Sequence, residues 1–153
     1  MNKILVAVDG SDSSKRAAEK AAELALSLDS EVTLIHVHTE TAKPPTDQFN
    51  EVASYLSAET LAEIMDQKEE RIRNEKEKIV EEAAVFFDKK GIEINKEVLY
   101  GDPADVVCDY AEENGFDLIV LADKGQGKVK RFLLGSISDK VVRHANISVL
   151  IVK

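Results

Sequence analysis

Residues 101–122 read GDPADVVCDYAEENGFDLIVLA and combine a helix with the strand that follows it. Asp102 is a favourable N-cap residue, and Pro103 suits the first turn of a helix. Gly115 ends this helix, and the apolar run at 117–122 predicts a strand that is buried on both faces. Strands of this kind belong to parallel sheets covered by helices, so the stretch indicates the α/β fold class.

The alternation of apolar strands and amphipathic helices continues on both sides of this stretch. Short apolar runs predict further strands, and apolar residues at helical spacing predict further helices. The predicted order is strand 4–8, helix 17–28, strand 32–37, helix 57–89, strand 92–99, helix 103–114, strand 117–122, helix 135–144 and strand 147–152. This order predicts one domain, 1–153, in three layers: an open parallel five-stranded sheet with helices on both faces.

Two segments depart from the regular pattern. Residues 92–99 alternate between apolar and polar side chains, which predicts an exposed or edge strand. Residues 39–54 contain the pair Pro44-Pro45, which forbids a helix there, so we expect an irregular stretch. A loop of that length is uncommon unless it is mobile or functional.

The composition limits the partners of the chain. A net charge of -9 argues against nucleic acid, whose binding needs cations on the protein, and against anionic membranes. Cys108 is the only cysteine, so no disulfide can form within the chain, which fits a reducing compartment. The sequence shows neither a signal-peptide pattern nor an apolar run of membrane-spanning length. We therefore expect a cytoplasmic protein with no nucleic-acid and no membrane partner.

The loop after the strand at 117–122 is the first candidate binding site. Gly125 lets backbone amides approach an anion without a Cβ in the way, and Gly135 and Ser136 stand at a helix start that favours a phosphate. The hydroxyls of Ser136 and Ser138 can add hydrogen bonds. Positive charge gathers in this loop of an acidic protein, at Lys124, Lys128, Lys130 and Arg131. The alternative is a solvated surface loop before a glycine-started helix.

Asp9, at the end of the first strand, is the second candidate. A carboxylate there can accept hydrogen bonds from ribose hydroxyls, as acids near strand ends do in dinucleotide-binding folds. The alternative is a turn residue that caps the next helix, because Asp-Gly-Ser is a common turn sequence. The residues alone leave both alternatives open.

Histidine and cysteine give weaker indications of a functional site than these two candidates do. His36 lies in the strand at 32–37, and its neighbours do not decide which face it takes. No cysteine or histidine stands at ligand spacing from it, so a structural role is favoured over a metal site. Cys108 lies in an amphipathic helix and is typical of a small buried hydrophobe. We predict no catalytic and no metal-ligating residue.

Several blocks of the sequence together resemble the universal stress protein family. They are ILVAVDGS at 4–11, VTLIHV at 32–37, the stretch at 101–122, and LLGSISDKVVRHANISVLIVK at 133–153. The family motif has a glycine, two residues, a glycine, nine residues and then Gly-Ser or Gly-Thr. Gly125, Gly135 and Ser136 match this motif, whereas Ala122 replaces its first glycine.

The resemblance implies a fold and a site. The fold is Rossmann-like, similar to adenine nucleotide alpha hydrolases, with strand order 3-2-1-4-5 and a variable loop at about 39–56. The site binds ATP or AMP between the first and fourth strands, with Asp9 on the ribose and with Ala7 and Val37 beside the adenine. Phosphate contacts are implied for Gly125, Gly135, Ser136 and Ile137. The full predicted set of nucleotide-binding residues is Ala7, Val8, Asp9, Val37, Leu121, Ala122, Lys124, Gly125, Gly135, Ser136, Ile137 and Ser138.

Ala122 is the departure that matters for this site, because the resemblance implies that its methyl group would lie close to the ribose. Alanine is harmless there if its φ is negative. A positive φ would strain the residue and distort the pocket.

Three functions follow from these observations. The leading hypothesis is a regulatory protein of the stress response that binds an adenine nucleotide and turns it over slowly or not at all. Mg²⁺ or Mn²⁺ can arrive with a triphosphate. The second is an enzyme, because DGSDS at 9–13 loosely resembles the Ser-Gly-Gly-x-Asp-Ser loop of ATP pyrophosphatases, although the glycine pair is missing. The third is an interaction module whose pocket stays empty.

The last predicted strand, ISVLIV at 147–152, bears on the oligomeric state. It would be an exposed apolar edge in a monomer, and such edges are usually covered. Pairing between the final strands of two subunits would cover both edges with two-fold symmetry. The resemblance implies the same arrangement, so we predict a homodimer through this strand.

Overall fold

The computed structural model of the chain describes residues 2–39, 50–51, 53–125 and 134–153. Within these ranges, strands and helices alternate as the sequence predicts. In chain order they are β1 (Lys3–Ala7), α1 (Asp12–Leu28), β2 (Glu31–His38), α3 (Ala58–Asp88), β3 (Ile94–Tyr100), α4 (Pro103–Glu113), β4 (Leu118–Ala122), α5 (Ser136–His144) and β5 (Ser148–Val152).

The five strands form one parallel sheet in the order β3-β2-β1-β4-β5. Both the strand order and the parallel pairing are confirmed. β3 and β5 are the outer strands, as predicted for both segments. Because all strands run the same way, β1, β2 and β4 end at one edge of the sheet, and the loops that follow them meet there.

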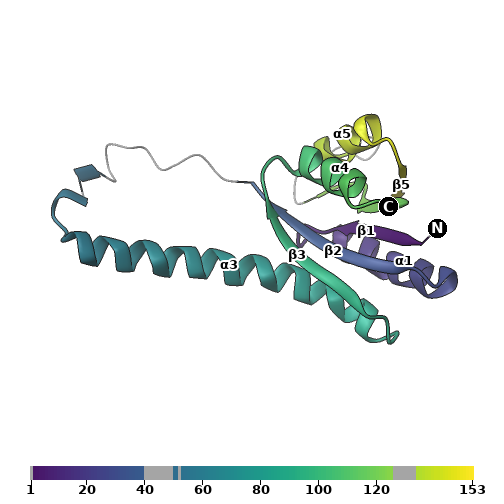
Figure 1. Cartoon of the computed structure of the whole chain (residues 1–153), viewed down its shortest axis with the longest axis horizontal. Helices are drawn as coiled ribbons and strands as arrows, with labels where there is room; N and C mark the ends of the chain where they lie inside the picture. The colour runs from purple at the N-terminus through teal and green to yellow at the C-terminus, as the bar shows by residue number, and fades with distance from the viewer. Residues whose placement is uncertain (1, 40–49, 52, 126–133) are drawn as a thin grey trace.

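Helices cover both faces of the sheet, with α1 and α3 on one side and α4 and α5 on the other (Figure 1). β1 is buried along Ile4, Leu5 and Val6, and β4 along its whole length, which explains their continuous apolar runs. α1 turns a row of small side chains to the sheet, at helical spacing: Ala17, Ala18, Ala21, Ala22 and Ala25.

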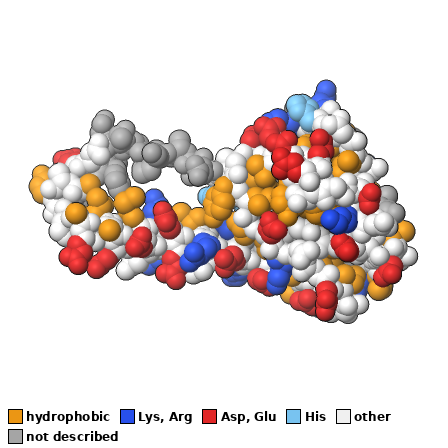
Figure 2. All heavy atoms as spheres, in the orientation of Figure 1, with side chains coloured by type: hydrophobic (Ala, Val, Ile, Leu, Met, Phe, Trp, Pro, Cys, Tyr) orange, Lys and Arg blue, Asp and Glu red, His pale blue; other side chains and the backbone are white. Residues whose placement is uncertain are grey.

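α3 is much longer than the sheet that it covers. Its buried residues lie near the C-terminal end, at Val80, Ala83, Ala84 and Phe87. The N-terminal part extends beyond the sheet as a projecting rod (Figure 1). Charged side chains cover much of this rod, with hydrophobic ones gathered along one side (Figure 2). The prediction of a long helix with a wide solvated face is therefore confirmed.

One prediction about the local structure is wrong. The segment 39–54 was expected to be irregular, but Asn50, Glu51, Ala53 and Ser54 are helical. The Ser54 hydroxyl donates a hydrogen bond to the Glu51 carbonyl at 2.6 Å, as in a helical turn. The proline pair restricts only its own surroundings, and Pro44 and Pro45 lie outside the described residues.

Candidate functional site

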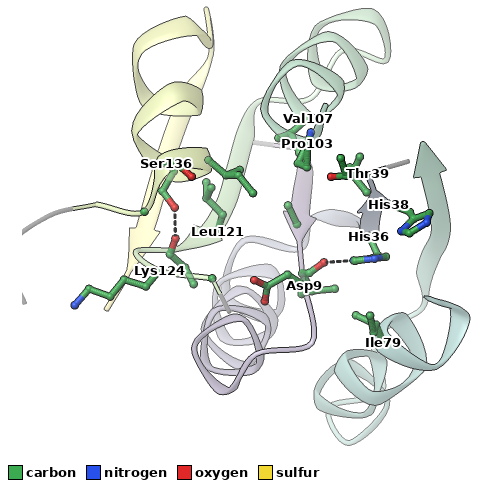
Figure 3. Close-up of a pocket in the computed structure, with 18 of the residues that line it drawn as sticks. Asp9, His36, His38, Thr39, Ile79, Pro103, Val107, Leu121, Lys124 and Ser136 are labelled. Carbon is green, nitrogen blue, oxygen red and sulfur yellow. Dashed lines mark hydrogen bonds between the residues drawn. The ribbon is translucent and has the colours of Figure 1, made fainter. Parts of the chain in front are cut away.

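A pocket of about 470 Å³ lies beyond the carboxyl ends of β1, β2 and β4 (Figure 3). Each of the twelve residues predicted from the sequence to bind nucleotide lines it. They come from the end of β1 (Ala7, Val8, Asp9), the end of β2 (Val37), the end of β4 and the following loop (Leu121, Ala122, Lys124, Gly125), and the start of α5 (Gly135, Ser136, Ile137, Ser138). The fold thus brings the whole predicted set together in one cavity.

Asp9 is held in the turn between β1 and α1. Its Oδ1 accepts a hydrogen bond from the Ser11 backbone N–H at 3.0 Å. The N-cap of α1 is Ser11, whose Oγ accepts from the Ser14 N–H at 3.1 Å. The alternative in which Asp9 caps the helix is therefore wrong in detail: Asp9 orders the turn, and Ser11 caps the helix.

Gly125 allows the loop after β4 to approach the Asp9 carboxylate. A Cβ built on Gly125 would collide with Oδ2 of Asp9. The backbone of Gly125 does not have the positive φ that would itself call for glycine. Glycine permits this close approach between the end of β1 and the end of β4, because any Cβ here would displace the Asp9 carboxylate.

Gly135 is the N-cap of α5 and packs against the same loop. Its N–H donates to the Asp123 carbonyl at 2.7 Å. A Cβ on Gly135 would lie 3.3 Å from that carbonyl oxygen and 3.4 Å from Cα of Lys124. Because the first N–H groups of a helix have no partner within it, the start of α5 presents donors that suit an anion.

The two serines at the start of α5 have different environments. Ser138 is only 4% exposed, and its hydroxyl donates to the Ala122 carbonyl at 2.8 Å. This proton ties α5 to the end of β4, so the expected hydrogen bond from Ser138 to a phosphate is not available. Ser136 is exposed and lies at the pocket (Figure 3).

Ala122 causes no backbone strain. Among the described residues, Asp29 is the only non-glycine residue with a positive φ. The φ of Ala122 is therefore not positive, and the alanine is unstrained. It is the last residue of β4 and is buried. A glycine at this position is therefore not required by the backbone.

Sequence reasoning missed several residues that line the pocket: His36, His38, Thr39, Lys76, Ile79, Pro103 and Val107. Lys76 and Ile79 come from α3, and no local motif connects them with the strand ends. Lys76 adds a second lysine, in addition to the predicted Lys124, to the described residues that line the pocket. Of the basic residues predicted in the loop, Lys128, Lys130 and Arg131 lie outside the described residues.

His36 forms a buried connection between β2 and the end of β1. Its Nδ1 lies 2.8 Å from the Val8 carbonyl oxygen (Figure 3). Its Nε2 is enclosed and has no hydrogen-bond partner in the described part of the chain. Burial is the main cause that lowers the pKa of His36, and Lys76 and His38 lower it further. The structural role favoured from the sequence agrees with this geometry.

We expect the free energy of unfolding to fall as the pH drops below about 6.5, the pKa of an unperturbed histidine. The folded chain has a lower His36 pKa than the unfolded chain, so the unfolded chain binds the proton first. The loss begins near that pH and is complete below the folded pKa. Urea titrations from pH 8 to pH 5 measure it, and His36→Asn, which cannot titrate, should flatten the profile. Identical profiles for both proteins would contradict this assignment.

Metal centres and membrane-spanning helices are two further classes of feature to consider in the described residues. Within residues 2–39, 50–51, 53–125 and 134–153, no three His, Cys, Asp or Glu residues gather as a metal site would require. No described helix combines the length and apolar character needed to cross a membrane. Cys108 is buried, and burial raises the pKa of its thiol, which keeps it protonated.

Both the sequence and the fold of this chain are similar to those of known proteins. The Universal stress protein family matches residues 1–153. The chain is 34% identical to universal stress protein YxiE of Bacillus subtilis over 152 residues, which cover 99% of both chains. The solved structure of protein MJ0577 has a TM-score of 0.76 and 24% identity, and the match covers 99% of this chain and 95% of that one.

A further solved structure is that of a universal stress protein from Archaeoglobus fulgidus in complex with dAMP. It has a TM-score of 0.61 and 26% identity, and the match covers 100% of this chain and 98% of that one. The family match over the full chain, the identity to a curated relative, the strand order and the shared fold agree with one another. This chain belongs to the universal stress protein family.

Proposed function

We propose that the protein binds an adenine nucleotide, ATP or AMP, in this pocket and acts as a regulatory module in the stress response. The observation that carries the proposal is the meeting of Asp9, Gly125 and the start of α5 in one cavity. A volume of about 470 Å³ lies within the range of small-molecule sites. The family relative with bound dAMP supports the ligand class.

Each part of the nucleotide has a matching part of the pocket. The ribose hydroxyls donate to the Asp9 carboxylate, and the adenine lies beside Ala7 and Val37. The phosphates accept hydrogen bonds from amides around Gly125 and at the start of α5, with Lys124 nearby. A triphosphate can bring its own Mg²⁺ or Mn²⁺.

A binding role with slow or no turnover fits the carboxylates of the site better than an enzyme does. Asp9 is the only Asp or Glu among the described residues that line the pocket. It accepts a hydrogen bond from the backbone of Ser11 and lies against Gly125, so it is placed to bind rather than to move a proton.

We place the protein in the cytoplasm, in keeping with its single cysteine and its net charge of -9.

Identifying the nucleotide that the protein carries tests the proposal. The protein is purified without added nucleotide and denatured, and the released small molecules are analysed by mass spectrometry. We expect an adenine nucleotide in the wild type and much less of it in Asp9→Ala, because that variant lacks the ribose acceptor. Wild-type protein that releases none, and that fails to bind added ATP or AMP in calorimetry, would contradict the proposal.

We also propose a homodimer in which the β5 strands of two copies pair. β5 is an outer strand of the sheet, and Val149, Leu150, Ile151 and Val152 are each only partly buried in a single chain. Pairing across a two-fold axis would satisfy the free backbone groups of both edges. Light scattering at micromolar concentration should give twice the chain mass, and a monomeric mass would contradict the pairing.

A further inference from the structure

His36 holds the peptide bond that leads into Asp9. β1 ends at Ala7, and the next residue, Val8, is held by two consecutive residues of β2. The Val8 N–H donates to the Ile35 carbonyl at 2.9 Å, and the Val8 carbonyl lies 2.8 Å from Nδ1 of His36. β2 thus fixes the backbone one residue beyond the end of β1.

The other side of this peptide is fixed as well. The N–H of Asp9 belongs to the same peptide unit as the Val8 carbonyl, and it donates to Oγ of Ser14 at 3.3 Å. A planar peptide that is hydrogen-bonded at both its carbonyl and its N–H has little freedom to rotate. The direction in which the Asp9 side chain leaves the backbone is therefore set from β2 and from α1.

The proton on His36 can be assigned from its partner. A backbone carbonyl only accepts, so Nδ1 carries the hydrogen and donates it to Val8. In the neutral ring, Nε2 then has no hydrogen. The charged and titratable groups around the ring are Lys76 of α3, His38 of β2 and Asp9. Burial and Lys76 oppose a positive charge on the ring, so His36 stays neutral and keeps this tautomer.

His36 also lies on the opposite face of β2 from the residue expected to contact adenine. Side chains alternate along a strand, so His36 shares its face with Val32 and Leu34, whereas Val37 shares its face with Ile35. His36 is 6% exposed and is one of the residues that line the pocket, as are Asp9 and Ile79 (Figure 3). Its action on the ribose therefore passes through Asp9.

We propose that His36 is a positioning residue whose Nδ1–H holds the Val8–Asp9 peptide and so gives the site its preference for nucleotides with free ribose hydroxyls. The inference rests on the proposed nucleotide-binding function. It goes beyond that function because it names His36, which need not touch the ligand, as the residue that sets the orientation of the Asp9 side chain.

Two substitutions at position 36 separate the hydrogen bond from the packing. His36→Phe keeps a ring of similar size and removes the donor. His36→Asn places an amide nitrogen at the same distance along the side chain as Nδ1 and keeps the donor. Calorimetry gives the dissociation constants of ATP and of 2′,3′-dideoxy-ATP for each protein, and the measured quantity is their ratio. Asp9→Ala provides the ratio expected when the ribose acceptor is missing.

For the wild type we expect ATP to bind about tenfold more tightly than the dideoxy compound, as hydrogen bonds to a carboxylate would give. His36→Phe should bring the ratio close to that of Asp9→Ala, whereas His36→Asn should keep most of the wild-type preference. A wild-type ratio in His36→Phe overturns the positioning role. If His36→Phe does not fold, His36→Gln is measured in its place, because its amide lies one bond further out. The same loss of preference is expected for His36→Gln.

A second measurement does not depend on nucleotide binding. Nitrogen-15 NMR of the ligand-free protein reports which ring nitrogen carries the hydrogen. We expect the Nδ1–H tautomer, and an Nε2–H tautomer would overturn the inference even if ATP binds. Conversely, wild-type protein that has the Nδ1–H tautomer but no preference for the ribose hydroxyls contradicts the proposed role of Asp9 and ends the inference with it.

Discussion

Gly135→Glu should weaken ATP binding by about 100-fold, which corresponds to roughly 2.8 kcal/mol. Gly135 is the N-cap of α5, and the proposed site has the phosphates bound by the N–H groups of the first turn of this helix. A carboxylate at this place competes for those donors and repels the phosphates. Calorimetric titration of ATP into the variant and the wild type measures the change.

The fold should survive this substitution. The φ of Gly135 is -62°, which any residue adopts, and a negative side chain at a helix start is favourable. Gly135→Ala is the matched control, because it adds the same Cβ, 3.3 Å from the Asp123 carbonyl oxygen, but no charge. It should cost only a few-fold in affinity. Equal losses in the two variants would show that crowding, rather than charge at a phosphate site, explains the effect.

Gly125→Ala should weaken ATP binding by about tenfold, or roughly 1.4 kcal/mol. The added methyl group collides with Oδ2 of Asp9, and the carboxylate must turn away from the place where the ribose is expected. The backbone of Gly125 needs no positive φ, and among the described residues the added Cβ meets only the carboxylate of Asp9.

A double-mutant cycle with Asp9→Ala isolates this contact. If the methyl group acts by displacing the Asp9 carboxylate, then Gly125→Ala should cost almost nothing once that carboxylate has been removed. Dissociation constants for the wild type, both single variants and the double variant complete the cycle. Additive losses would mean that the loop after β4 contributes independently of Asp9, and the proposed joint site would be wrong.

Much of the fold follows from local patterns in the sequence. β1 and β4 are recognisable because they are buried on both faces and are apolar, apart from Lys3 at the start of β1. α4 is recognisable because Asp102 caps it, accepting from the Asp105 N–H, and because Pro103 stands in its first turn. The spacing of apolar residues alone places the start of α1 too late: the helix begins at Asp12, because Ser11 caps it ahead of the first apolar residues.

The candidate site likewise contains some residues that local sequence patterns predict and others that they do not. Asp9, Gly125 and Gly135 stand at strand ends and a helix start, where topology alone brings them to one edge of the sheet. Lys76 reaches the pocket from α3, and its place depends on how that helix packs against β2 and α1. The bond between Ser138 and Ala122 depends on side-chain packing between elements in the same way. The periodicity of apolar residues within one segment gives no information about such contacts between different elements.

His36 shows why the rest could not be predicted. The strand pattern gives its burial but not its partner, because the Val8 carbonyl belongs to a residue 28 positions away. Only the register of β2 against β1, with Ala7 opposite Ile35, places the imidazole beside that carbonyl. The resemblance to the universal stress protein family implies which residues contact the ligand. It does not identify the supporting hydrogen bond between His36 and the Val8 carbonyl.

The comparison of ATP with adenosine tests the phosphate site most directly. Both ligands carry the same base and ribose, so only the amides near Gly125, the start of α5 and the nearby lysines can distinguish them. Calorimetric titration of the wild type should give an affinity for ATP at least about 100-fold higher than that for adenosine. Equal affinities would contradict the account, because the glycine loop and the helix start would then have no part in holding phosphate.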